Sequence, residues 1–431
     1  MNDSRIADLL ERIPTGVFIN GEFTESSSGN RFDVRNPATG EVLITVADST
    51  PEDAARAMDL AAEAQWDWAV TAPRERAEIL RRAFELATGK YKDDLATVMT
   101  LEMGKPLDQA YGEVTYGAEF LRWFSEEAAR IRGDYFRVPE GHLQAVVVRR
   151  PVGPCLFITP WNFPLAMATR KAGPAFAAGN VAILRPSQET PLTALLFAQI
   201  MNEAGLPKGV LAVLPSKSSR PITGPLIQDP RMRKISFTGS TQVGKALLKE
   251  AAENVLRTSM ELGGNAPFIV FEDADIDKAV EAAVATKMRN MGEACNAADH
   301  FFVHTDVYDE FTEKFAAHIA GQKVGDGLDG STDVGPLVSE KQLADVSAMI
   351  DRAVEAGAKI AAGGGKPFNT GYFLEPTVLV DVDPESDIVK DEIFGPVAPV
   401  IRFDDEAELI KTINKDSVGL GGYFHTKDMN R

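Results

Sequence analysis

The sequence is poor in cysteine, in long apolar runs and in positive charge. Only Cys155 and Cys295 occur among its 431 residues, which makes a disulfide framework implausible and fits a reducing compartment. No segment reaches the run of about 18 apolar residues that a membrane helix needs. The N-terminus also lacks the basic stretch and apolar core of a secretory signal. We therefore expect a cytoplasmic protein that does not bind a membrane.

Acidic residues outnumber basic ones by 63 to 45, which gives a formal net charge of −18. This balance disfavours nucleic acids and anionic membranes as partners, because both attract clustered Lys and Arg. An anionic substrate would be repelled unless arginines were placed locally around it. No Cys/His cluster has the spacing of a zinc site, so we expect no metal.

A chain of this length predicts two or more domains. In residues 151–271, short β-branched runs alternate with helical patterns, which predicts an α/β fold with a doubly wound parallel sheet. The expected strands are Leu156–Thr159, Val181–Leu184, Val210–Leu214, Lys234–Thr238 and Ala266–Phe271, and the helices include Pro191–Ala204 and Gln242–Glu253.

Three segments directly follow expected strands: Thr159–Phe163, Arg185–Gln188 and Gly239–Thr241. Ligands of such sheets bind outside the carboxyl ends of the strands. We therefore expect these segments to form one rim on which a nucleotide binds.

Other elements are expected outside this block. Thr50 can cap a helix that continues to Ala64, and Asp275 can cap a second amphipathic helix. Residues 131–150 are expected to form a hairpin outside the main sheet, and Phe301–His304 to form a strand.

The segment Gly239–Lys245 has the spacing of a phosphate-binding P-loop. That motif needs Ser or Thr after the lysine to hold Mg²⁺, and Ala246 stands there. A P-loop ATPase is therefore disfavoured. The segment still follows a strand and opens a helix, so its amides can face a diphosphate.

Cys295 lies among small residues, which would leave its sulfur approachable by a substrate. This context favours a nucleophile over the buried structural role that free cysteines often have. Asn162 stands between two prolines, where a rigid amide donor can stabilise an oxyanion or simply form a turn. His300 and His304 leave open a Cys–His hydrolase, although alternation in their strand predicts edge or surface positions.

Taken together, these residues resemble the aldehyde dehydrogenase superfamily over nearly the whole chain, closest to succinate-semialdehyde dehydrogenases. The resemblance rests on five motifs in family order and spacing: TPWNFP at 159–164, FTGSTQVGK at 237–245, MELGGNAP at 260–267, GEAC at 292–295 and EIFGPV at 392–397. Each motif alone is weak, whereas the set is highly specific.

The resemblance implies a chemistry for three residues. Cys295 would attack the aldehyde carbon, and Asn162 with the Cys295 backbone amide would hold the oxyanion. Hydride transfer to the nicotinamide would leave a thioester, and Glu261 would activate the water that hydrolyses it. The implied cofactor-binding residues are Thr159, Pro160, Trp161, Arg185, Ser187, Gln188, Gly239, Ser240, Val243, Leu262, Glu392 and Phe394.

Two arginines match the positions that grip the distal carboxylate of succinate semialdehyde in the resembled enzymes. These are Arg170 and Arg289. Their positive charges would offset the repulsion between an anionic substrate and the acidic chain. The expected reaction is therefore the oxidation of an ω-carboxy aldehyde, with glutarate semialdehyde as an alternative because it is one methylene longer. The alternative interpretation is that Arg170 is only a surface residue of a helix.

The cofactor is expected to be NADP or NAD. Many NAD-using relatives carry Lys and Glu where this chain has Arg185 and Gln188. A neutral Gln188 removes the repulsion of a 2′-phosphate and Arg185 adds a partner for it, which favours NADP.

The resemblance also implies a domain division and an assembly. Residues 1–130 and 152–258 would form the NAD(P)-binding domain, 131–151 a bridging β-hairpin and 259–431 the catalytic domain. A homodimer or homotetramer is expected. Relatives continue beyond the position of Arg431, so the catalytic domain is expected to be incomplete, with exposed sheet edges.

Near the nucleophile, Asn296 and Asp299-His300 depart from the usual residues of the family. An acid four residues from a thiolate would disfavour its charged form. A catalytically silent, nucleotide-binding homologue therefore stays an alternative.

Overall fold

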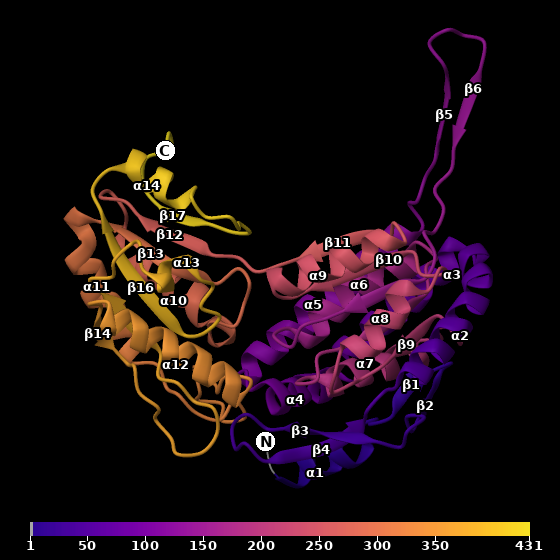
Figure 1. The fold of residues 1–431 in the computed structure, drawn as a ribbon, viewed down its shortest axis with the longest axis horizontal. Helices are drawn as coiled ribbons and strands as arrows, with labels where there is room; N and C mark the ends of the chain where they lie inside the picture. Colours follow the sequence, from indigo (N-terminus) through magenta and orange to yellow (C-terminus); the bar gives the residue numbers. More distant parts are fainter. Residues whose placement is uncertain (1–2) are drawn as a thin grey trace. The chain divides into compact units, whose positions relative to one another are not determined.

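The computed structural model describes residues 3–431, which divide into two compact units (Figure 1). The first unit contains residues up to Val34, Val42–Met99 and Ala110–Glu261. The second contains Leu262–Arg431, joined by two segments that precede it in the chain, Arg35–Glu41 and Thr100–Gln109. The cofactor-binding and catalytic roles of the two parts of the chain stay predictions.

The first unit is built on a seven-stranded sheet in the order β11-β10-β7-β8-β9-β1-β2. Strands β7 to β11 pair in parallel, whereas β1 and β2 add an antiparallel edge. The strands of this unit are β1 Val17–Ile19, β2 Glu22–Thr24, β3 Arg31–Arg35, β4 Val42–Ala47, β5 Asp134–Arg137, β6 Gln144–Val147, β7 Cys155–Ile158, β8 Ala182–Arg185, β9 Leu211–Val213, β10 Lys234–Thr238 and β11 Arg257–Glu261; β3 ends at Arg35, in the second unit.

Helices accompany these strands, and the first long one begins as its sequence predicts. Thr50 and Asp53 form a capping box, in which each side chain accepts a hydrogen bond from the other residue's backbone N–H. The helix runs to Val70, six residues beyond the expected end at Ala64. The helices are α1 Asp3–Arg12, α2 Pro51–Val70, α3 Pro73–Thr88, α4 Lys92–Met103, α5 Leu107–Ala128, α6 Pro164–Ala177, α7 Pro191–Glu203, α8 Arg220–Gln228 and α9 Thr241–Glu253; α4 and α5 each extend into the second unit.

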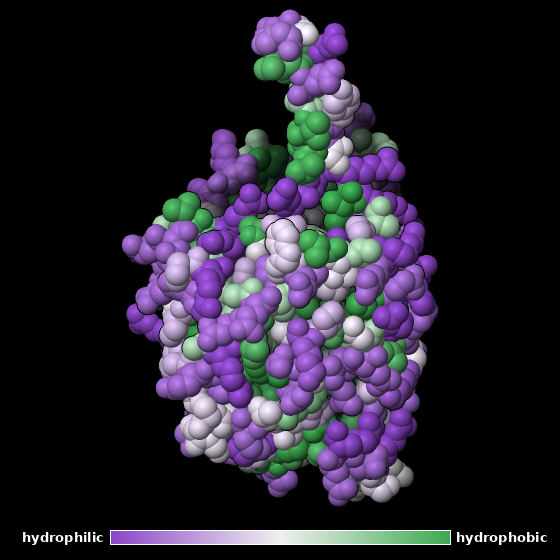
Figure 2. Space-filling model, turned by 90° about the vertical axis from the view of Figure 1, so that its right-hand side faces the viewer, coloured by the Kyte–Doolittle hydropathy of each residue, from purple (hydrophilic) through white to green (hydrophobic). Residues whose placement is uncertain are grey.

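The hairpin expected at residues 131–150 is present as the two-stranded sheet β5-β6. It projects from the rest of the first unit (Figure 1). On the face drawn in Figure 2, hydrophobic side chains lie along part of its stem, whereas most side chains toward its tip are hydrophilic. Tyr135 and Val146 pair across the hairpin and are each more than 60% exposed. Its bridging role stays a prediction.

The second unit is built on a six-stranded sheet in the order β14-β15-β16-β13-β12-β17. All pairs are parallel except β14 with β15. Its core is rich in aromatic side chains, among them Phe268, Phe301, Phe311 and Phe315. The strands are β12 Ala266–Val270, β13 Ala298–His304, β14 Lys359–Ala362, β15 Thr377–Val380, β16 Val397–Phe403 and β17 Tyr423–His425.

The helices of this unit are α10 Ile276–Met288, a 3₁₀ turn at Arg289–Gly292, α11 Thr305–Ala320, α12 Glu340–Glu355, α13 Asp387–Lys390 and α14 Glu406–Ile413. Asp275 caps α10, as predicted, by accepting a hydrogen bond from the Lys278 backbone N–H. The expected α/β fold, with a parallel sheet, a second α/β part and a small β element, is confirmed.

Two predictions about this unit are wrong. The sequence predicts Ala266–Phe271 as a strand of the first sheet, but β12 lies between β13 and β17 in the second. Edge or surface positions are predicted for His300 and His304, yet His300 is only 3% exposed and His304 is half-buried. The reason is that β13 lies inside the sheet and is buried on both faces, so its burial does not alternate.

No helix within residues 3–431 is both long and apolar enough to cross a membrane.

Candidate active site

Three segments of the first unit follow neighbouring parallel strands, β10, β7 and β8. They therefore share one edge of the sheet, as expected. After β7, Thr159 is buried and its N–H donates to the Arg185 carbonyl at 3.2 Å. Pro160 and Trp161 are half-buried between this contact and Asn162.

Asn162 is 4% exposed and lies at the entrance to helix α6. Its Oδ1 accepts a hydrogen bond from the Phe163 N–H at 3.1 Å. The side-chain amide is thus fixed at the end of β7, and Nδ2 is the atom that can donate to an oxyanion.

Glu113 supports the backbone that follows Asn162. Sequence patterns alone do not identify it as a functional residue. It lies on α5, is 2% exposed, and its Oε1 accepts hydrogen bonds from the N–H groups of Leu165 and Ala166 at 2.9 and 3.1 Å. A carboxylate at the positive end of α6 stabilises the first turn that follows Asn162.

The segment after β8 begins with Arg185, which is buried. Its Nε donates to Ser216 Oγ at 3.2 Å and its Nη2 to the Ser216 carbonyl at 2.9 Å. Burial lowers the pKa of Arg185 to about 10, so the guanidinium stays cationic at neutral pH. Ser187 is buried, whereas Gln188 is exposed and donates to Glu189 at 3.0 Å.

The turn from β10 into α9 contains the third segment. The Gly239 N–H donates to the Glu261 carbonyl at 3.0 Å, and Ser240 caps α9 by accepting from the Val243 N–H at 3.4 Å. A Cβ at Gly239 would lie 2.6 Å from the Phe237 ring, so a larger residue there would require this ring to shift. Val243 is 48% exposed on the first turn of α9.

Glu261 is exposed at the end of the edge strand β11. Its charge acts on Lys171, a buried residue of α6 that donates to Ser236 and Thr238 at 3.1 and 2.8 Å. Burial lowers the pKa of Lys171 to about 7; Arg170 adds to the decrease, and Glu261 opposes it. In the sequence, the only signal that Lys171 belongs to the site is its position next to Arg170.

Cys295 of the second unit is half-buried, while Cys155 of the first is fully buried. Burial raises the pKa of the Cys155 thiol to about 12, and its sulfur contacts the Gly153 carbonyl at 3.3 Å. Because a thiolate is the reactive form, Cys155 is not a nucleophile at neutral pH.

The backbone before Cys295 has an unusual shape. Asn290 and Met291 both have φ of 55°, a left-handed backbone conformation that residues other than glycine rarely adopt. The Gln109 side chain accepts from the Asn290 N–H at 2.6 Å, and the Asn290 side chain donates to the Glu293 carbonyl at 2.9 Å. These contacts fix the turn that presents Cys295.

The MELGGNAP segment lies directly against this turn. A Cβ at Gly264 would lie 2.6 Å from the Cys295 carbonyl oxygen, and one at Gly263 would lie 2.4 Å from Glu392 Oε2. The two glycines therefore allow the close approach of three motifs that are far apart in sequence. Leu262, just before them, is half-buried.

Glu392 and Phe394 occupy the EIFGPV motif. Glu392 Oε1 accepts from the Gly264 N–H at 3.3 Å. Burial raises the pKa of Glu392 to about 7, and the neighbouring Asp299 raises it further. Phe394 has φ of 51°, and its carbonyl accepts a hydrogen bond from the Gln342 side chain at 2.8 Å.

Arg170 and Arg289, the expected carboxylate clamp, belong to different units. Arg170 donates to the Tyr116 hydroxyl at 2.8 Å and lies over the Phe120 ring. Arg289 is exposed and donates to the Asn296 side chain at 3.1 Å.

The sequence profile of the aldehyde dehydrogenase family matches residues 23–431. The chain belongs to the aldehyde dehydrogenase family. It is 57% identical over 390 residues to a succinate-semialdehyde dehydrogenase of Paenarthrobacter nicotinovorans, covering 90% of this chain and 86% of that protein. It is 46% identical over 415 residues to a glutarate-semialdehyde dehydrogenase of Pseudomonas putida, covering 96% and 86% respectively.

A solved NADP-dependent enzyme of E. coli has the same fold, with a TM-score of 0.94 and 43% identity. The match covers 100% of this chain and 88% of that chain. The chain is thus an NAD(P)-dependent aldehyde dehydrogenase of the succinate-semialdehyde type. The cysteine hydrolase alternative is thereby set aside.

The unusual acid of this aldehyde dehydrogenase, Asp299, does not stand alone beside the nucleophile. Its Oδ1 lies 3.0 Å from Lys287 Nζ, and both side chains are buried. Burial raises the pKa of Asp299, and Lys287 opposes that increase. The sequence did not reveal this cation beside Asp299.

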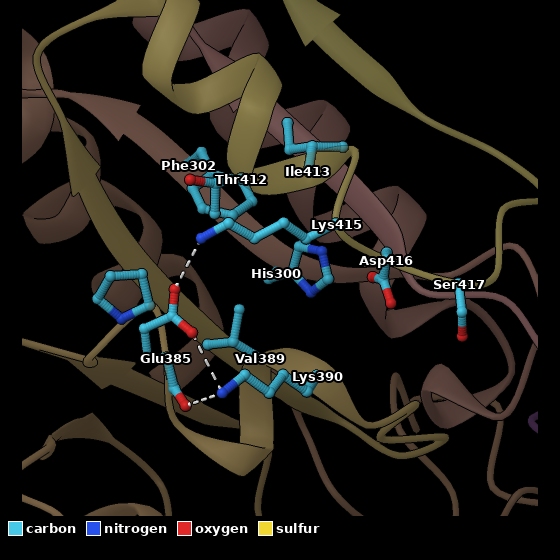
Figure 3. A pocket seen from close by; sticks show the side chains of 11 residues that line it. His300, Phe302, Glu385, Val389, Lys390, Thr412, Ile413, Lys415, Asp416 and Ser417 are labelled. Carbon is cyan, nitrogen blue, oxygen red and sulfur yellow. Dashed lines mark hydrogen bonds and ion pairs between the residues drawn. The ribbon is translucent and has the colours of Figure 1, made fainter.

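A pocket of about 290 Å³ lies in the second unit, beside the segment that leads to Glu392 (Figure 3). Glu385 forms ion pairs there with both Lys390 and Lys415, at 3.3 and 3.2 Å. The buried His300 also lines the pocket, and burial lowers its pKa to about 4. His300 is therefore neutral near pH 7. Within residues 3–431, no group of His, Cys, Asp and Glu has the arrangement of a metal site.

Proposed function

We propose that this aldehyde dehydrogenase oxidises an ω-carboxy aldehyde, first of all succinate semialdehyde, to the corresponding acid. The observation that carries the proposal is the contrast between the two cysteines. Cys155 is buried with a pKa of about 12, whereas Cys295 is half-buried on a turn held against Gly264. Only Cys295 has the accessibility that a nucleophile needs.

In the proposed reaction, the Cys295 sulfur attacks the aldehyde carbon and forms a thiohemiacetal. The Asn162 side-chain amide and the Cys295 backbone N–H stabilise its oxyanion. A bound nicotinamide would supply the hydride acceptor for this carbon, and loss of the hydride would leave a thioester on Cys295. Glu261 then removes a proton from the water that hydrolyses the thioester.

The rim of the first unit fits a dinucleotide. The N-terminus of α9 offers Ser240 and a tight turn with glycine at position 239, features that suit a diphosphate. The diphosphate would be flanked by Thr159, Pro160, Trp161, Ser187 and Val243. The nicotinamide end would be contacted by Leu262, Glu392 and Phe394.

NADP is the proposed preferred cofactor. Arg185 uses two of its five donors on Ser216 and keeps a cationic head at the end of β8. Gln188 is neutral, so it does not repel a 2′-phosphate. The ratio of kcat/KM for NADP and NAD, measured with one aldehyde, tests this preference.

Arg170 and Arg289 are proposed to bind the distal carboxylate of the substrate. Arg170 is held by Tyr116 and Phe120, and Arg289 donates to Asn296, so each guanidinium has a defined place. Glutarate semialdehyde differs from succinate semialdehyde by one methylene, worth about 1–3 kcal/mol of discrimination. It is the second candidate because a relative carries that name.

Arg170→Ala is expected to lower kcat/KM for succinate semialdehyde by about 10- to 100-fold, because a charge-assisted hydrogen bond contributes about 1.5–3 kcal/mol. For butanal, which has no carboxylate, kcat/KM should stay near the parent value. Initial rates with both aldehydes measure the difference. Arg122→Ala, at an exposed arginine of α5 that pairs with Glu119 and Glu126, is the matched control. Equal losses with the two aldehydes would instead assign Arg170 a structural role.

A further inference from the structure

The turn that contains the proposed nucleophile also contains Asn296. The Ala297 N–H donates to the Ala294 carbonyl at 2.9 Å, which closes a turn with Cys295 and Asn296 as its central residues. Asn296 is exposed, whereas the other three residues of this turn are buried or half-buried. The side chain that directly follows the nucleophile is therefore accessible from solvent.

Two hydrogen bonds hold Asn296 from different elements of the second unit. Its backbone carbonyl accepts from the Tyr423 hydroxyl at 2.7 Å. Its side-chain oxygen Oδ1 accepts from Arg289 Nη2 at 3.1 Å. Tyr423 begins β17, and Arg289 directly follows α10, so the two contacts join three separate segments. The backbone and the side chain of Asn296 thus have different partners.

The contact with Tyr423 holds the backbone of the turn. Strand β17 lies beside β12 (Figure 1), where Tyr423 pairs with Phe268 and their ring centroids lie 6.1 Å apart. The Tyr423 ring packs on the core of the second unit, so its hydroxyl has a fixed place. On the other side, Gly264 allows a close approach to the Cys295 carbonyl. Neither contact uses the side chain of Asn296.

The side-chain contact acts on Arg289 instead. Arg289 is exposed, and a long exposed side chain samples many rotamers unless a partner restrains it. The hydrogen bond to Asn296 ties its guanidinium to the residue next to the sulfur. An ω-carboxy aldehyde has its reactive carbon at the sulfur and its carboxylate at the other end. The position of the guanidinium relative to the sulfur therefore decides which aldehydes can reach both groups.

We propose that Asn296 is a positioning residue that holds Arg289 where it binds the distal carboxylate of the substrate. This inference rests on the carboxylate-binding role of Arg289 in the proposed function. Asn296 acts through Arg289 and takes no part in bond making. An aldehyde without a carboxylate gains nothing from the contact, so Asn296 contributes to specificity and not to the chemical step.

Asn296→Ala tests the proposal, because it removes the side-chain contact and keeps the backbone carbonyl that Tyr423 binds. The measured quantity is the ratio of kcat/KM for succinate semialdehyde to kcat/KM for butanal. This ratio should fall about 2- to 10-fold, as expected for the loss of one net hydrogen bond. The fall should come from a higher KM for succinate semialdehyde, with kcat near the parent value. Asn414→Ala, at an exposed asparagine at the end of α14, is the matched control and should leave the ratio unchanged.

A double-mutant cycle separates positioning from a structural role. Arg289→Ala should lower the same ratio, and adding Asn296→Ala should lower it no further, because the partner of Asn296 is already absent. Losses that multiply in the double variant would overturn the proposal. An unchanged ratio in Asn296→Ala would overturn it as well.

Alkylation of Cys295 tests the contact without aldehyde or cofactor. Iodoacetate carries a carboxylate and iodoacetamide does not, so the ratio of their rates reports a cation held near the sulfur. This ratio should fall in Asn296→Ala and should fall no further when that change is added to Arg289→Ala. A parent protein that does not oxidise succinate semialdehyde would refute the proposed function. An unchanged alkylation ratio in Asn296→Ala would instead refute the positioning role of Asn296.

Discussion

Replacing Cys295 with alanine is expected to abolish aldehyde oxidation while NADP binding is retained. Removing the nucleophile of a covalent mechanism typically costs a factor of about a thousand or more in kcat. Cys155 cannot take over, because it is fully buried in β7 with a pKa of about 12. Initial rates of reduced nicotinamide formation measure the loss, and calorimetry measures NADP binding.

The two cysteines provide their own control. Cys155→Ala should keep the parent turnover and stay sensitive to iodoacetamide, which would react at Cys295. Cys295→Ala should bind the same amount of NADP and resist further modification. If Cys295→Ala turned over aldehyde at the parent rate, another group would have to be the nucleophile.

Glu261→Gln is expected to separate the two halves of the reaction. Hydride transfer needs Cys295 and Asn162, whereas hydrolysis of the thioester needs a base. The variant should therefore give a burst of about one reduced nicotinamide per active site and then slow by about 10²- to 10⁴-fold in the steady state. Stopped-flow absorbance resolves the burst, and intact mass spectrometry should find the acyl group on the protein.

The exposed Glu253 at the end of α9 gives a matched control for this experiment. Glu253→Gln should show the parent steady-state rate without an accumulated acyl group. A full steady-state rate in Glu261→Gln would mean that Glu261 is not the base. Loss of both the burst and the steady state would place Glu261 before hydride transfer instead.

Much of the first unit follows from local sequence patterns. The bounds of β7, β8, β9 and β10 were predictable within one residue because short β-branched runs alternate with helices. The carboxyl ends of these strands lie at one edge of the sheet because neighbouring strands run parallel. The start of α2 was predictable from Thr50 and Asp53, whose capping box is local.

Long-range partners could not be predicted in this way. A strand pattern at Ala266–Phe271 does not say which sheet the strand joins, and β12 joined the second one. Alternation gave the wrong burial for His300, because a strand inside a parallel sheet is buried on both faces. The contiguous apolar run Phe301–Val303 is in fact typical of such a strand.

The supporting residues of the site show the same limit. Glu113 reaches the first turn of α6 from 52 residues away, and Lys287 pairs with Asp299 across 12 residues. Neither spacing belongs to a local motif. The left-handed backbone at Asn290 was also invisible, since the residue type does not demand it. Sequence motifs identified the candidate nucleophile, base and oxyanion donor. The contacts that hold the surrounding residues could be identified only from the folded structure.

The most direct test of the central claim is turnover of succinate semialdehyde by the purified chain. The aldehyde is mixed with NADP and, separately, with NAD, and reduced nicotinamide is followed by absorbance. We predict continuous turnover that depends on Cys295 and is faster with NADP. A folded protein that binds NADP yet forms no reduced nicotinamide with succinate semialdehyde, glutarate semialdehyde or butanal would contradict the account and point to a catalytically silent homologue.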